Sequence, residues 1–246
     1  MTVAAADTVP AEAIFAALEA TWPPRAWHAA PGWRVGEGAG GGRRVSCGIA
    51  TAPDAAPEAL AEAHRALGQP ALALIRDADA GLDARLADAG WRTLAPTLAV
   101  AAPVPRLAVA PPPVTAFEVE WPPLQVQVEL WERGGVGPAR RAAMARAAGP
   151  RVALLGRADD SPVATAFAAC HGTLAMVHAL EVAPERRRRG LARHLIGAAA
   201  LWAARQGAAS LAMLVMRDNA PACALARALG MDTVAQYHYR LREESP

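Results

Sequence analysis

Two segments of this chain repeat each other, and this repeat limits the folds that the chain can adopt. Residues 74–90 read LIRDADAGLDARLADAG, and residues 214–230 read LVMRDNAPACALARALG. Each copy runs from an apolar, strand-like stretch through Arg-Asp into a short helical stretch that ends at glycine, and each continues into another strand-like segment. The repeat therefore predicts a duplicated α/β unit, with the first copy diverged from the second.

A proline-rich stretch separates the two copies. Residues 100–114 contain five prolines and follow neither a helical nor a strand period, so they predict an extended connector. We expect a first unit over residues 1–104, a linker over residues 105–113 and a second unit over residues 114–246. The expected fold class is α/β (α+β), with two units that each hold a mixed, mostly antiparallel sheet flanked by helices.

The composition predicts a globular protein with no membrane or nucleic-acid partner. Of the 246 residues, 53% are hydrophobic, which supports a sizeable core, yet the apolar runs are too short to span a bilayer. The N-terminus lacks the features of a signal peptide, so we expect a cytoplasmic protein. A net charge of +2 is too small to attract nucleic acid in bulk. Three cysteines without a CxxC pair predict neither disulfides nor a metal site.

Periodicity in the second half predicts an antiparallel meander, then a helix, a buried strand, a second helix and a last strand. The expected strands cover residues 152–156, 163–171, 173–182, 211–216 and 234–239. The first helix covers residues 191–206, and Asn219 is expected to cap the second, which ends at Gly230. Residues 124–131 fit both a strand and a helix opened by two prolines, and the helix is favoured.

The stretch over residues 181–195, EVAPERRRRGLARHL, predicts an anion site. Where a strand feeds a helix through a glycine-containing loop, several backbone N–H groups lack partners and the helix dipole is positive beside them. Gly190 lets the backbone approach a ligand, Ala192 is small enough to leave room, and arginines suit phosphate oxygens. A pyrophosphate fits such a site.

The four adjacent arginines also have a simpler interpretation as a solvated basic face, because successive side chains cannot all reach one ligand. We expect Arg187 and Arg189 to flank the phosphates, with Arg186 and Arg188 pointing outward. A nucleic-acid interface is disfavoured, since no aromatic residues lie between the basic ones.

Two ordered motifs in the second half resemble those of the GCN5-related N-acetyltransferases, the GNAT superfamily. Residues 187–192 (RRRGLA) match (Q/R)-x-x-G-x-(G/A) and follow a Val-x-Pro at residues 182–184. Asn219, Ala222, Leu225 and Gly230-Met231 then match N-x-x-A-x-x-L-(Y)-x-x-x-G-(F/M). The resemblance covers residues 114–240, and the first half resembles a degenerate copy in a tandem arrangement that some bacterial acetyltransferases have.

This resemblance implies an acetyl-CoA-dependent transfer of an acetyl group to a primary amine of a small molecule or protein, by a monomer or homodimer. The strand carrying Leu180 and Val182 would separate from its neighbour and offer backbone groups to the pantetheine arm. The pyrophosphate would be held by the backbone amides of Arg187, Arg188, Arg189, Gly190, Leu191 and Ala192. Asn219 would contact the cofactor beyond it, and no metal is implied.

Two residues are candidates for the base that an alkylammonium acceptor needs before attack. His178 titrates near neutrality, and the run HALEV resembles the corresponding strand of arylalkylamine N-acetyltransferases, where a histidine works through water. The alternative is a core histidine bonded to the backbone. Glu181, on the opposite face of an ideal strand, is the second candidate, and its alternative is a solvated carboxylate.

The expected proton donor is missing, because the tyrosine of the second motif is Ala226 here. Tyr237 is our candidate for that role, with Tyr239 beside it on the last strand, although both also fit simple packing. Cys223 is interpreted as a small core residue. A non-catalytic acyl-CoA-binding or regulatory module therefore stays as the alternative function.

The first half has its own glycine-rich stretch, GEGAGGGRR at residues 36–44. It is interpreted as a hairpin loop, because the helix expected from Pro57 lacks an R-x-x-G-x-A element. We therefore expect one cofactor site per chain, with the first half completing the acceptor pocket or covering a sheet edge.

Overall fold

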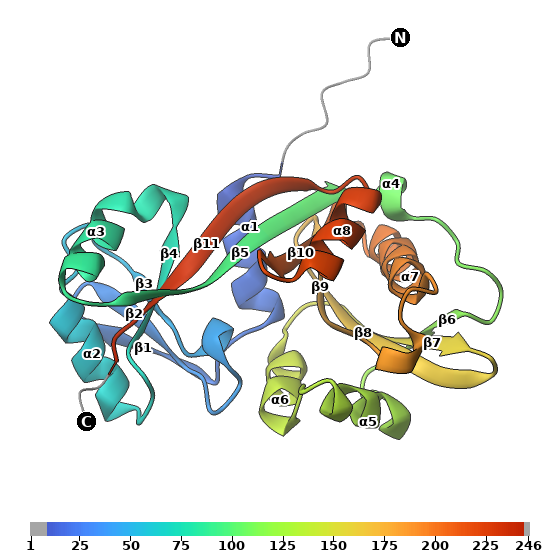
Figure 1. Ribbon diagram of the computed structural model, residues 1–246, viewed down its shortest axis with the longest axis horizontal. Helices are drawn as coiled ribbons and strands as arrows, with labels where there is room; N and C mark the ends of the chain where they lie inside the picture. The colour runs from blue at the N-terminus through green and yellow to red at the C-terminus, as the bar shows by residue number, and fades with distance from the viewer. Residues whose placement is uncertain (1–8, 244–246) are drawn as a thin grey trace, which may run out of the picture.

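The computed structural model describes residues 9–243, which form a single mixed sheet of eleven strands with helices on both faces (Figure 1). The first half contributes strands β1 (Ala26–Ala30), β2 (Trp33–Glu37), β3 (Gly48–Ala50), β4 (Leu72–Arg76) and β5 (Arg92–Pro103). Its helices are α1 (Ala11–Thr21), α2 (Pro57–Ala66), α3 (Ala80–Asp88) and the short α4 (Val104–Leu107).

The second half contributes strands β6 (Ala116–Val119), β7 (Arg151–Ala158), β8 (Ser161–His171), β9 (Leu174–Val182), β10 (Ser210–Met216) and β11 (Asp232–Leu241). Its helices are α5 (Gln125–Arg133), α6 (Pro138–Arg146), α7 (Leu191–Arg205) and α8 (Ala220–Ala228). The predicted meander is therefore confirmed in β7, β8 and β9, and residues 124–131 are largely helical.

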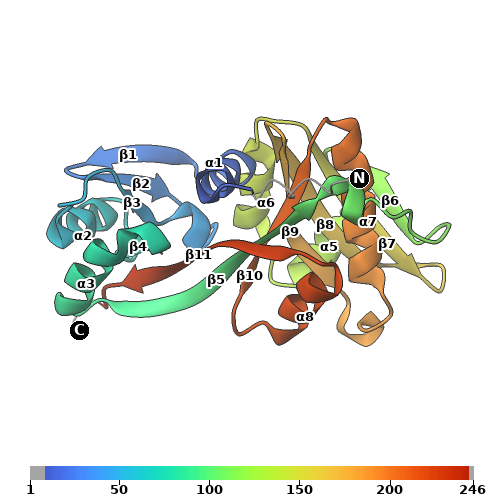
Figure 2. The ribbon, with the colours of Figure 1, turned by 90° about the horizontal axis from the view of Figure 1, so that it is seen from above.

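The halves are joined by an exchange of their last strands. The sheet order is β1-β2-β3-β4-β11-β5-β10-β9-β8-β7-β6, so β5 pairs antiparallel with β10 of the second half, while β11 pairs antiparallel with β4 of the first. Figure 2 shows the two long strands crossing side by side between the halves. The expectation of two sheets was wrong, because each β-α-β unit delivers its last strand to the neighbouring half.

The proline-rich stretch is also more structured than expected. Strand β5 runs to Pro103 and buries Val100, Ala101 and Ala102, and α4 follows at once. Prolines fit here because they stand at a strand end and in the first turn of a helix, where a missing N–H costs little. Only residues 108–115 lack regular structure between α4 and β6.

Three apolar clusters hold the layers together. One lies between the sheet and the α4, α7 and α8 face of the second half, and a smaller one lies under α2 and α3 in the first half. The third covers the opposite face and spans both halves, with Phe15 of α1, Trp131 of α5, Phe167 of β8 and Tyr237 of β11. Helix α1 packs against β8 and β9, so the first helix of the chain covers strands of the second half.

Among residues 9–243, no helix has the length and apolar character needed to cross a membrane.

Candidate functional site

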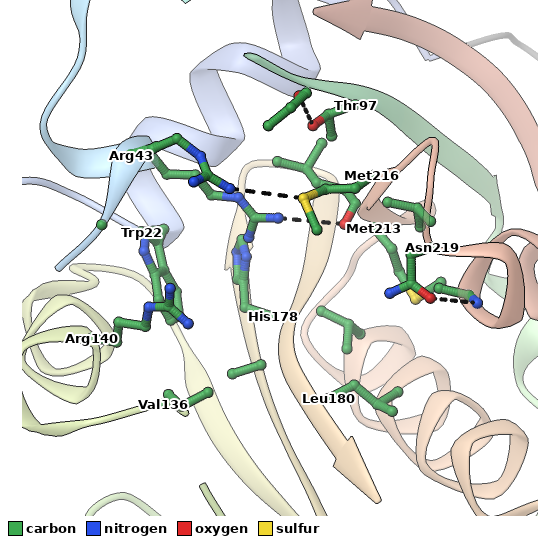
Figure 3. Close-up of a pocket in the computed structure, with 18 of the residues that line it drawn as sticks. Trp22, Arg43, Thr97, Val136, Arg140, His178, Leu180, Met213, Met216 and Asn219 are labelled. Carbon is green, nitrogen blue, oxygen red and sulfur yellow. Dashed lines mark hydrogen bonds between the residues drawn. The ribbon is translucent and has the colours of Figure 1, made fainter. Parts of the chain in front are cut away.

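A cavity of about 460 Å³ opens where β9 and β10 separate (Figure 3). The two strands pair in parallel from Leu174↔Ser210 only as far as Val177↔Met213, although β9 continues to Val182 and β10 to Met216. Leu180 and Val182 therefore no longer pair with β10, and the backbone of β9 is open to the gap. The separation expected for this strand is present.

The cavity passes through the sheet, because its wall includes residues from both faces. Leu180, Ala222 and Leu225 belong to the apolar layer of α7 and α8, whereas Trp22, Val136 and Tyr237 belong to the layer of α1, α5 and α6. A long ligand that enters on the α7 and α8 side can therefore meet a second ligand that enters from the other face.

A β-bulge at Ala179 places His178 and Glu181 on the same face of β9. His178 is opposite Phe167 on β8 and Glu181 is opposite Thr165, so one residue of β8 faces two of β9. Ala179 has a left-handed φ of 47°. The expectation that Glu181 points to the opposite face was wrong, because the extra residue reverses the alternation of side chains.

His178 is almost fully buried and bonded to a side chain of the first half. Its Nε2 lies 2.8 Å from the hydroxyl of Thr21, and that hydroxyl donates to the carbonyl of Ala17 over 2.7 Å. The imidazole must therefore donate from Nε2, which leaves Nδ1 with a free lone pair. Nδ1 has no hydrogen-bond partner within residues 9–243. Burial, and secondarily the charge of Arg44, hold the pKa of His178 well below 6.5.

Glu181 lies beside the turn between α5 and α6. A Cβ at Gly134 would approach the Glu181 carboxyl carbon to 2.6 Å, so a side chain at this position would displace the acid. Burial raises the pKa of Glu181 above 4.5, opposed by the charges of Arg187 and Arg140. His178 and Glu181 are thus two different bases on one wall of the cavity.

The two tyrosines of β11 also line the cavity. Tyr237 and Tyr239 are buried with their rings edge to face, 5.5 Å between centroids. The Tyr239 hydroxyl has no partner among the described residues, and burial raises its pKa well above 10, so it keeps its proton. Ala226 is buried and offers no hydroxyl, whereas Cys223 is not fully buried as expected but packs, partly exposed, against the α7 and α8 cluster. Its Sγ donates to the carbonyl of Met216 over 3.6 Å.

The predicted anion loop has the expected backbone. Gly190 is the N-cap of α7 in the left-handed conformation, with φ 79°, and is not inside the helix. The amides of residues 188–193 donate to no acceptor within the described part of the chain. Gly190 is required here because a side chain at this φ is strained. The loop therefore presents a group of free N–H donors at the positive end of a fifteen-residue helix.

The side chains of Arg186, Arg187 and Arg189 bond to other groups of the protein and do not converge on one point. Arg186 and Arg189 both pair with Asp159, and the Arg189 distance is 3.0 Å. Arg187 donates from Nε to the Val182 carbonyl over 3.1 Å, and Arg188 has a left-handed φ of 65°. The free amides, not four converging guanidinium groups, are the main anion-binding feature of this loop.

Asn219 lies at the rim of the cavity. Its Oδ1 accepts a hydrogen bond from the amide of Ala222 over 3.1 Å, which confirms the predicted cap of α8. Its amide nitrogen stays available to a ligand, since Asn219 also lines the cavity.

The first half contributes to this wall, which is one of the two roles expected for it, but sequence reasoning did not identify the residues that do so. The loop between β2 and β3, which form the predicted hairpin, brings Gly41, Gly42, Arg43 and Arg44 to the cavity. Thr21 and Trp22 come from the end of α1, and the Trp22 ring lies 5.0 Å from the His178 ring. The glycine-rich composition marked the loop, but nothing local in the sequence shows which side of the sheet it reaches.

The residues present fit a long nucleotide thioester. Free amides at the N-terminus of α7 suit a pyrophosphate, and the open edge of β9 suits the amides of a pantetheine arm. In the part of the chain from residue 9 to residue 243, no group of three or more His, Cys, Asp or Glu side chains is arranged to hold a metal ion.

The fold and this site define a class of protein, and comparisons agree with it. Solved structures similar to this chain include a GCN5-related N-acetyltransferase from Kribbella flavida, at 20% identity over 98% of both chains with a TM-score of 0.73. Another is an acetyltransferase of the GNAT family from Novosphingobium aromaticivorans, at 21% identity over 89% of this chain and 91% of that one, with a TM-score of 0.57. At these identities the likeness shows the GNAT fold.

A third similar structure is a tandem GNAT protein from the clavulanic acid biosynthesis pathway, at 17% identity over 75% of this chain and 67% of that one, with a TM-score of 0.56. Residues 114–231 match the sequence model of the acetyltransferase (GNAT) family. No curated protein matches the chain.

Proposed function

We propose that this protein is an acetyl-CoA-dependent N-acetyltransferase that acts on a primary amine of a small molecule or protein. The observation that carries the proposal is the cavity through the sheet, which joins the free amides of α7 to the wall with His178 and Glu181. The amides of residues 188–192 would hold the pyrophosphate, the open backbone at Leu180 and Val182 the pantetheine, and Asn219 the adjoining part of the cofactor.

In this reaction the amine nitrogen forms a bond to the acetyl carbon as the carbon–sulfur bond breaks. The ammonium acceptor first loses a proton, and His178 can accept it at Nδ1 because its pKa is too low for the ring to be protonated already. Glu181, on the same wall, is the second acceptor for that proton. A direct transfer needs no covalent intermediate on the protein.

The thiolate leaves with a proton from a donor in the cavity. The Tyr239 hydroxyl keeps its proton and has no partner among the described residues, and Tyr237 lies next to it. We propose this pair in place of the tyrosine that Ala226 replaces.

We also propose that the two halves are copies of one ancestral unit, the first one degenerate. The repeated segments at residues 74–90 and 214–230 fall on β4-α3 and on β10-α8, at equivalent places on the two sides of the exchanged strands. The proposed boundaries stay 1–104 and 114–246; β5 ends at Pro103, just before the first boundary, and α4 crosses it.

Ala226 also favours one alternative, a module that binds acyl-CoA without chemistry. Incubation with acetyl-CoA and a panel of amines, with thiol release as the readout, separates the two. Thiol release above the amine-free rate is expected. A protein that acetyl-CoA stabilises against heat, but that releases no thiol with any amine, would be the non-catalytic module.

A further inference from the structure

The wall of the cavity on the α1 and α6 side carries three arginines and one acid. Arg43 and Arg44 come from the loop between β2 and β3, Arg140 comes from α6, and Glu181 is the acid. Within residues 9–243, none of the three guanidinium groups is paired with a carboxylate, whereas Arg25, Arg34 and Arg141, for example, each form such a pair. The cavity therefore holds an excess of positive charge.

Each of these arginines is held by a weak contact to a neutral group. Arg44 donates to the Leu214 carbonyl over 3.4 Å, Arg140 donates to the Gly135 carbonyl over 3.3 Å, and an Arg43 nitrogen lies 3.9 Å from the Met216 sulfur. A guanidinium has five N–H donors, so most of them stay available. Figure 3 shows Arg43 and Arg140 on the same side of the cavity as Trp22 and His178.

Two buried polar atoms on the same wall also lack partners. His178 and Tyr239 are each only 2% exposed, and within the described residues neither Nδ1 nor the phenol oxygen is bonded. Buried polar atoms are nearly always satisfied in native proteins, so these two groups stand out on the same wall as the arginines.

The arginines are on the wrong face to serve the cofactor phosphates. The free amides precede α7, which packs on one face of the sheet, whereas Trp22, Val45 and Val136 around the arginines pack on the other. A ligand at the arginines therefore belongs to the acceptor.

We propose that the acceptor is an amine that also carries an oxyanion, a carboxylate or a phosphate, which Arg43, Arg44 and Arg140 bind while the amine lies toward His178 and Glu181. This inference rests on the proposed acetyl transfer for its chemistry. Guanidinium groups bind both oxyanions through paired, charge-assisted hydrogen bonds. A neutral or polycationic amine has no oxyanion for these arginines to bind.

The test compares matched acceptors on the full chain. One arm uses ω-amino acids of two to six carbons and their carboxamides, and the other uses O-phosphoethanolamine and ethanolamine. Thiol release is expected to show a kcat/KM for the anionic member at least about tenfold above its neutral partner, because hydrogen bonds to charged groups are the strong ones. The arm with the larger ratio identifies the oxyanion. Equal or faster turnover of the neutral partners would overturn the proposal.

A double variant, Arg43→Gln with Arg140→Gln, tests the residues. The anionic-to-neutral ratio is expected to fall about tenfold, while affinity for acetyl-CoA stays that of the parent. The control matched for two lost charges is Arg65→Gln with Arg242→Gln, two exposed arginines that do not line the cavity. A double variant that instead loses acetyl-CoA affinity would assign these arginines to the cofactor and overturn the proposal.

Calorimetry tests binding of the acceptor independently of acetyl transfer. Titration of the CoA-loaded protein with the same acceptor pairs measures binding whether or not any thiol is released. Tighter binding of the anionic members without turnover would support the anion site and contradict the proposed acetyl transfer. No difference in binding and no difference in turnover would contradict the anion site alone.

Discussion

The two halves of the sheet each contain one pair of parallel strands joined by a crossover helix, and only one of these units is built to take a ligand. In the second half, β9 and β10 separate after four pairs and α7 starts from Gly190 with free amides. In the first half, β3 and β4 meet at Gly48↔Ala73, and α2 starts from Pro57, which has no N–H to offer.

Side chains also fill the space in the first half. The Trp33 indole donates to the Ala56 carbonyl over 2.8 Å, at the N-cap of α2, and a Leu60 methyl occupies the place that a Cβ on Gly48 would need. An anion site therefore needs more than a strand, a loop and a helix in the right order. It needs a loop that leaves its amides unused and neighbours that stay out of the way.

The sharpest test of this difference uses the two buried histidines, one in each half. His178→Gln keeps a donor for Thr21 but removes the basic ring nitrogen, so kcat is expected to fall about a hundredfold while acetyl-CoA affinity stays unchanged. His64 has both ring nitrogens bonded to carbonyls, of Leu60 and Ser46. His64→Gln should cost about 1–3 kcal/mol of unfolding free energy and leave kcat of the folded protein unchanged.

Thiol release and urea denaturation on both variants give the answer. If His64→Gln lowered kcat as much as His178→Gln does, the two histidines would not differ in role.

A second comparison concerns glycines with a left-handed backbone. Gly190→Val is expected to weaken acetyl-CoA binding about tenfold, because a side chain at φ 79° strains the loop by roughly 1–2 kcal/mol and moves its amides. Gly172, at φ 55° in the turn between β8 and β9, is the control, since a Cβ there would meet nothing within 4 Å. Gly172→Val should lose similar stability without loss of binding, as measured by calorimetry and thermal unfolding. Equal affinities in the two variants would contradict the anion loop.

The pH dependence of stability tests the burial of His178. Because its folded pKa lies well below 6.5, the unfolded chain binds a proton that the folded chain excludes as the pH falls below 6.5. The contribution to unfolding free energy is complete above pH 6.5 and is lost below it, by at most about 1.4 kcal/mol per pH unit. Urea denaturation at pH 7.5 and 5.5 should show a smaller drop for His178→Gln than for the parent. The same drop in both proteins would show that His178 titrates normally in the fold.

The last prediction is that the number of bound acetyl-CoA molecules does not change. Calorimetry should give one acetyl-CoA per chain, and Pro57→Ala should not add a second, since Trp33 still occupies the start of α2. Two equivalent sites in the parent protein would contradict the difference between the halves.

Local features of this protein follow well from the sequence. The αL glycine before α7, the Asn219 cap and the helix over residues 125–133 all depend on interactions within a few residues. The repeat at residues 74–90 and 214–230 located both strand-helix units, because apolar strands and glycine stops carry strong signals.

Non-local features did not follow. β5 and β11 are both long strands with buried residues, and nothing local in either decides which half it joins, so the single sheet was missed. The bulge at Ala179 has neither Gly nor Pro to mark it, and it decides that His178 and Glu181 share a wall. The Thr21 contact joins residues 157 positions apart, which local patterns cannot predict.

The exchanged strands also determine which fragments of this chain can fold alone. A fragment that stops after α4 would carry β5 without β10 and β4 without β11. The complementary fragment would carry β10 without β5 and β11 without β4. Each product would expose an apolar strand edge that invites aggregation. When the two fragments are refolded together from denaturant, each should supply the strands that the other lacks. We therefore expect the chain to tolerate a break in its backbone better than the loss of either fragment.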